Sequence, residues 1–141
     1  MDTSKKYIKM CDCIEVQSCK SGLDRNDFFR INYDNIPDLT NFVFFVTGHI
    51  GDLSVGKEAI WLPRQDQIQE MLVQIPLGVS VDNDWQKVCI GFVRYVTTSA
   101  YYFFHVEKGL YGSMEQLWLA YYMHEKHGKV WDGDRWVVAT I

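Results

Sequence analysis

The chain has 141 residues, of which 48% are hydrophobic and 15% aromatic, and its formal net charge at pH 7 is −4. This composition excludes a disordered chain, because disordered segments lack the apolar residues that build a core. The length suits a single domain spanning residues 1–141. The acidic balance argues against a nucleic-acid-binding protein, since such proteins usually carry a basic surface.

From the N-terminal residues we expect no secretion signal. The longest uncharged apolar runs hold about seven residues, well below the roughly 20 that cross a bilayer. We therefore expect a cytoplasmic protein without a membrane segment. Thiols are usually reduced in that compartment, and the chain has four cysteines, Cys11, Cys13, Cys19 and Cys89.

The first half of the chain predicts one helix and then strands. Ser4 or Thr3 can cap a helix that runs to about Cys19 and presents its apolar residues at helical spacing. Residues 28–33 form a short strand in this interpretation. Residues 41–46 form a second strand that is apolar without alternation, and such a strand is usually covered on both faces.

Two helices follow in the middle of the chain. The first spans 63–74, with Pro63 at the first helical position, where the missing N–H is not needed. The second spans 83–94. Its apolar face is predicted from the helical repeat, and it comprises Trp85, Val88, Cys89, Phe92 and Val93.

The last third predicts a strand, a helix and a hairpin. Residues 100–106 are continuously apolar and form the strand. Ser113 and Gln116 have the spacing of a capping box at the start of a helix over 114–127, and Gly128 ends it. Residues 117–123 are apolar on every side, so we expect them to lie between layers or against another subunit. Asp132-Gly133 predicts a hairpin turn.

Together these elements predict an α+β fold. A mostly antiparallel sheet would contain the strands at 41–47 and 100–106 and the C-terminal hairpin. Helices near 4–19, 63–74, 83–94 and 114–127 would cover it in an α/β/α-type sandwich.

Three segments, together with the opening Tyr7–Cys11, carry a family resemblance: Trp61–Met71, Ser113–Ala120 and Gly128–Val137. They resemble small uncharacterised proteins of bacterial phages and prophages with the phage ABA-sandwich domain. The resemblance implies a helix–sheet–helix sandwich and a phage or mobile-element setting. The family has no assigned activity, so it implies no functional residues.

Two groups of residues are weak candidates for a metal site, and neither predicts a metal. Cys11, Cys13 and Cys19 point in different directions if their segment is one helix, because each residue turns by about 100°. His124 and His127 stand at i and i+3, but they lie near a helix C-terminus, where histidine also interacts with the helix dipole. We expect no cofactor.

The pairs of residues that could act in catalysis are equally weak candidates. Cys89 with His105 or His49 could form a thiol–imidazole pair, but burial on an apolar face would make the thiol inert. The pairs Asp82/Asp84 and Asp132/Asp134 fall at predicted turns or caps, where aspartate makes local hydrogen bonds.

The strongest binding candidate is the polar cluster that opens the helix after Trp61, where an arginine meets free N–H groups that suit a carboxylate or a partner's backbone. The candidate binding residues are Trp61, Arg64, Gln65, Asp66 and Gln67. Trp61, Trp131 and Trp136 also lie at element ends, where aromatic residues serve either an interface or the core.

The leading hypothesis is a phage- or prophage-encoded accessory protein that binds a macromolecular partner, with a protein favoured. One alternative is an enzyme or small-ligand-binding protein with an aromatic-lined pocket built around His105, His124, His127, Glu125 and Arg64. The other alternative is a homo-oligomeric structural protein. The sequence leaves all three open, and it favours a non-enzymatic role.

Overall fold

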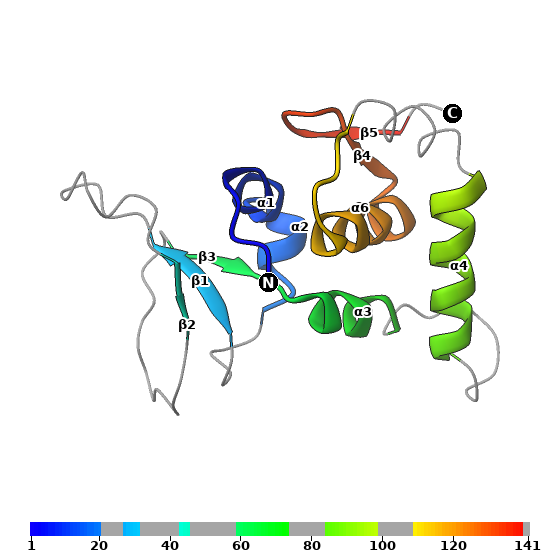
Figure 1. Cartoon of the computed structure of the whole chain (residues 1–141), viewed down its shortest axis with the longest axis horizontal. Helices are drawn as coiled ribbons and strands as arrows, with labels where there is room; N and C mark the ends of the chain where they lie inside the picture. Colours follow the sequence, from blue (N-terminus) through cyan, green and yellow to red (C-terminus); the bar gives the residue numbers. More distant parts are fainter. Residues whose placement is uncertain (21–26, 32–42, 46–58, 74–83, 99–108, 140–141) are drawn as a thin grey trace. The chain divides into compact units, whose positions relative to one another are not determined.

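The structure is a computed structural model of the chain, and it describes residues 1–20, 27–31, 43–45, 59–73, 84–98 and 109–139. Two compact units, Met1–Arg64 and Gln65–Ile141, divide the chain, and each is described by itself. Helices and small antiparallel sheets make up the described residues, which confirms the α+β class (Figure 1). The sandwich arrangement and the single domain stay predictions.

The first unit combines two short helices with a three-stranded antiparallel sheet in the order β2-β1-β3. Its elements are α1 (Lys5–Cys11), α2 (Ile14–Gln17), β1 (Phe28–Ile31), β2 (Val43–Phe45) and β3 (Ala59–Leu62). In the central strand, Phe29 lies opposite Phe44 of β2 and Trp61 of β3. The strands predicted at 28–33 and 41–46 are therefore confirmed over the residues that the structure describes there, 28–31 and 43–45.

The single helix expected from Ser4 to Cys19 is wrong. Ser4 caps α1 as expected, with its hydroxyl oxygen accepting from the Tyr7 N–H at 3.2 Å. The helix ends at Cys11, and Cys13 is extended (φ −147°, ψ 154°) before α2 begins. The Cys11 carbonyl, which a continuous helix would have bonded itself, accepts at the break from the Cys13 N–H and from Gln17 Nε2, both at 2.8 Å, so Gln17 helps to stabilise the break.

The sequence analysis does not predict β3, although Pro63, directly after this strand, is a signal for extended backbone. The residue before a proline favours extended backbone, so Pro63 extends Leu62 and the short apolar run before it. Helix α3 begins only at Gln65, so the placement of Pro63 at the first helical position is wrong. The Pro63 carbonyl instead accepts a hydrogen bond from the Tyr7 hydroxyl at 2.5 Å.

The second unit contains three helices and a hairpin. The elements are α3 (Gln65–Val73), α4 (Asp84–Thr98), α6 (Met114–His127), β4 (Lys129–Trp131) and β5 (Trp136–Val138). The helices predicted at 63–74, 83–94 and 114–127 are confirmed, although α4 continues to Thr98. Both α3 and α4 pack against α6.

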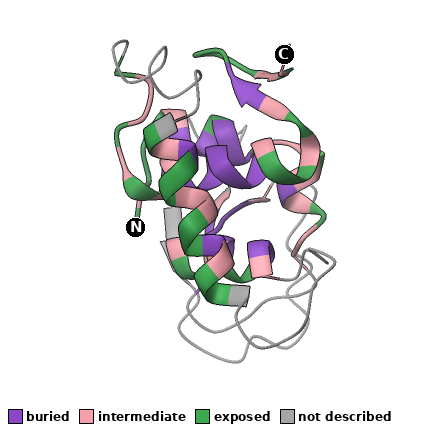
Figure 2. Ribbon diagram, turned by 90° about the vertical axis from the view of Figure 1, so that its right-hand side faces the viewer, coloured by how far each residue is buried: buried purple, intermediate pink, exposed green. Residues whose placement is uncertain are grey.

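Helix α6 is the buried centre of this unit. The Ser113 hydroxyl accepts from the Gln116 N–H at 3.2 Å, while Gln116 Oε1 accepts from the Gly112 N–H at 2.9 Å, so the capping box is shifted by one residue. Gly128 ends the helix at φ 60°. All residues from Trp118 to Met123 are buried within this chain (Figure 2). Their apolar character therefore requires no second subunit.

The hairpin expected at Asp132-Gly133 is confirmed, with Trp131 opposite Trp136. Among the described strands it forms a two-stranded sheet of its own, separate from the sheet that holds β2. The single sheet expected to join the hairpin with 41–47 stays a prediction, because it also contains the strand at 100–106. The strand expected at 100–106 lies outside the described residues.

Candidate interaction surface

Helix α4 buries one face against α6. Val88 and Tyr95 are buried on that face. The Phe92 ring stacks on Trp118 with ring centroids 3.7 Å apart and planes inclined by 7°, and the Tyr95 ring lies 5.3 Å from the Tyr121 ring. Aromatic contacts of this kind add to the hydrophobic term, so they fix which side of α4 faces inward.

The buried face is rotated from the one that the sequence predicts. Of the five residues expected there, Val88 is buried and Phe92 is half-buried, while Trp85, Cys89 and Val93 are exposed. Tyr95 is buried on this face instead of the three exposed residues. Gly91 lies on the side of α4 that approaches α6. The hydrophobic repeat predicts that α4 has an apolar face, but the aromatic side chains of α6 determine which residues of that face are buried.

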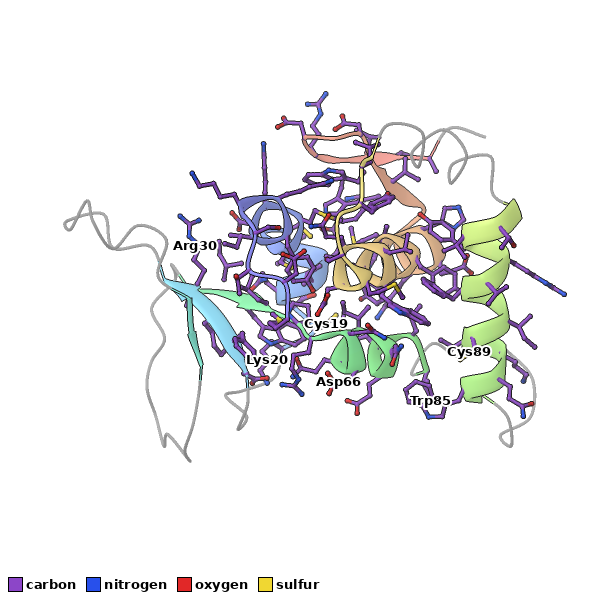
Figure 3. All side chains as sticks on the ribbon, viewed as in Figure 1. Cys19, Lys20, Arg30, Asp66, Trp85 and Cys89 are labelled. Atoms are coloured by element: carbon purple, nitrogen blue, oxygen red, sulfur yellow. The ribbon has the colours of Figure 1, made fainter. Side chains whose placement is uncertain are left out.

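The exposed residues form a continuous apolar surface. Trp85, Cys89 and Val93 stand at i, i+4 and i+8, so they follow one ridge of the helix, with Ile90 beside it. The exposed fractions are 50% for Trp85, 53% for Ile90 and 55% for Val93. We call these four residues the α4 ridge; Figure 3 labels Trp85 and Cys89.

Cys89 has an exposed thiol. The expectation that it is buried and inert is wrong, because the face on which it lies does not meet α6. Its suggested partners His105 and His49 lie outside the described residues, so the thiol–imidazole pair stays the weak candidate that the sequence suggests. Within the described residues, Cys89 is chemically accessible at the middle of the α4 ridge.

The members of the predicted binding cluster differ in their exposure. Trp61 is a core side chain of the first unit, only 4% exposed, with Lys20 Nζ lying 5.6 Å from its ring. Arg64 ends that unit, and Gln65, Asp66 and Gln67 open α3 in the second. Asp66 is exposed and the other three polar residues are half-buried. The burial of Trp61 excludes it as a surface contact, and binding by the other four residues stays a prediction.

The cysteines of the first unit occupy different environments. Because the helix breaks at Cys13, the geometric argument against a zinc site there no longer holds. Cys11 is buried, which raises its pKa well above the ordinary value, and burial raises the pKa of Cys13 to about 11. Both thiols therefore stay protonated near neutral pH in the metal-free chain. Throughout the described ranges, no three His, Cys, Asp or Glu side chains cluster as metal ligands would.

His124 and His127 contact different neighbours on α6. His124 Nδ1 lies 3.1 Å from Glu125 Oε1, and its ring lies 5.3 Å from the Tyr95 ring. His127 Nε2 lies 3.5 Å from the Tyr122 hydroxyl. These contacts give each imidazole a local structural role near the end of the helix.

Asp132 has the local role that its position in a turn suggests. Its Oδ1 accepts from the N–H groups of Asp134 and Arg135, at 2.8 and 2.9 Å. Asp84 begins α4, and Asp82 lies outside the described residues. Trp131 is buried and Trp136 is half-buried, with their rings 5.1 Å apart. These two indoles therefore complete the core of the hairpin.

In the part of the chain that the structure describes, no helix is both long enough and apolar enough to span a membrane. Comparisons with protein families, curated proteins and solved structures find no match for this chain. The resemblance to phage proteins therefore stays a prediction, and the α4 ridge is the feature from which function can be argued.

Proposed function

We propose that this protein acts by binding another macromolecule and that the α4 ridge is its contact surface. Single exposed apolar residues are ordinary on any protein surface. A continuous apolar stripe over several helical turns is different, because it is a surface that association removes from water. Trp85 supports the proposal further, since tryptophan is enriched among the residues that dominate binding energy.

The setting that we propose is that of a phage- or prophage-encoded accessory protein in the host cytoplasm. The resemblance of Trp61–Met71, Ser113–Ala120 and Gly128–Val137 to phage proteins supports this setting. The net charge of −4 favours a protein partner over a nucleic acid, because it repels phosphates.

The alternative of a catalytic or ligand-binding pocket receives less support. His124 and His127 each contact a different neighbour on their own helix. His105 lies outside the described residues. The exposed α4 ridge therefore remains the best-supported functional surface.

The test compares the tagged wild-type chain with two matched variants in affinity capture from lysate of the native host. Val93→Asp places a charge in the ridge, whereas Val138→Asp makes the same change at an exposed valine of β5, 72% exposed. We expect a macromolecule that wild type and Val138→Asp retain and Val93→Asp loses, as quantified by mass spectrometry. Equal recovery with all three chains would contradict the role of the ridge.

A further inference from the structure

We draw no further inference here: the strongest candidate, the exposed apolar face of α4 that holds Trp85, Cys89, Ile90 and Val93, belongs to the surface already proposed for binding, and nothing in the described part of the chain shows what covers it.

Discussion

Gly91 of α4 lies so close to Tyr121 of α6 that a methyl group at position 91 would overlap the tyrosine hydroxyl. The same methyl carbon would lie 3.2 Å from Tyr121 Cζ. The hydrogen atom of glycine therefore lets the two helices approach at this point. Glycine weakens a helix by about 1 kcal/mol relative to alanine. The close contact with Tyr121 explains why α4 nevertheless has a glycine at position 91.

Gly91→Ala is the first prediction. Overpacking costs about 1–3 kcal/mol, which exceeds the gain in helix propensity of about 1 kcal/mol. We therefore expect a net fall in the free energy of unfolding of about 1 kcal/mol, measured by chemical denaturation.

The control removes the Tyr121 hydroxyl that the new methyl group would overlap. In the Tyr121→Phe background, Gly91→Ala should lower the free energy of unfolding much less than it does with Tyr121 intact, because only the smaller contact with the ring carbon remains. A Gly91→Ala protein that is more stable than wild type, with Tyr121 intact, would contradict the proposed close contact.

Gln17 carries the second prediction, because one side chain makes three hydrogen bonds. Its Nε2 donates to the carbonyls of Cys11 and Trp61 at 2.8 and 3.0 Å, and its Oε1 accepts from the Trp61 N–H at 2.9 Å. Gln17→Leu leaves the N–H and the carbonyl of Trp61 without their amide partner, while the Cys11 carbonyl keeps the Cys13 N–H. We expect the free energy of unfolding to fall by about 2–6 kcal/mol, at about 1–3 kcal/mol for each of the two unsatisfied groups.

Gln17→Glu is the matched substitution, since it keeps the size and the acceptor but faces two carbonyl oxygens with a carboxylate. This environment should raise the pKa of the introduced carboxyl group in the folded state above its unfolded value. The variant should then be most stable below the unfolded pKa and lose stability as the pH rises through the folded one. A stability difference from wild type that is the same at pH 4 and pH 7 would contradict the donor role of Gln17.

These contacts show which features could be predicted from sequence. Helix α6 could be predicted with its bounds because its signals are local: Ser113 caps one end, and Gly128 ends the other with a left-handed backbone. The hairpin is also local, since Asp132 makes its hydrogen bonds within the turn. Neighbouring residues are sufficient to specify both elements.

The features that sequence reasoning missed depend on distant residues. The break between α1 and α2 depends on Gln17, whose other partner, Trp61, lies 44 residues away. The exposed side of α4 depends on Trp118 and Tyr121, because these rings select the opposite face. No helical repeat within α4 contains that information, which is why the α4 ridge could not be predicted while the helix could.

Lys20 and Asp27 provide the third prediction. Lys20 Nζ lies 2.6 Å from Asp27 Oδ2, and the side chains are 12% and 0% exposed. Lys20→Met removes this cation and leaves the carboxylate buried, so the free energy of unfolding should fall by about 3–5 kcal/mol. Lys20→Met with Asp27→Leu removes both charges and should cost less than Lys20→Met alone. A double variant that is less stable than the single one would show that the pair itself provides the stability.

Asp132 gives the last prediction, which concerns pH. The backbone N–H groups of Arg135 and Asp134 hold the pKa of Asp132 below its ordinary value of 3.8. A carboxylate with a lowered folded pKa contributes its stability above the unfolded pKa, and this contribution is lost as the pH falls through the folded pKa. The turn should therefore stay intact at pH 4 and loosen only at more acidic pH.

The titration can be followed at the turn itself. The amide protons of Asp134 and Arg135 should shift together in NMR spectra with a midpoint below 3.8, and the contact between Trp131 and Trp136 provides an independent fluorescence signal. Asp132→Asn keeps an oxygen acceptor but does not titrate, so it should remove the pH dependence and keep the hairpin. A wild-type midpoint at or above 3.8 would mean that the two N–H groups do not bind the carboxylate in solution.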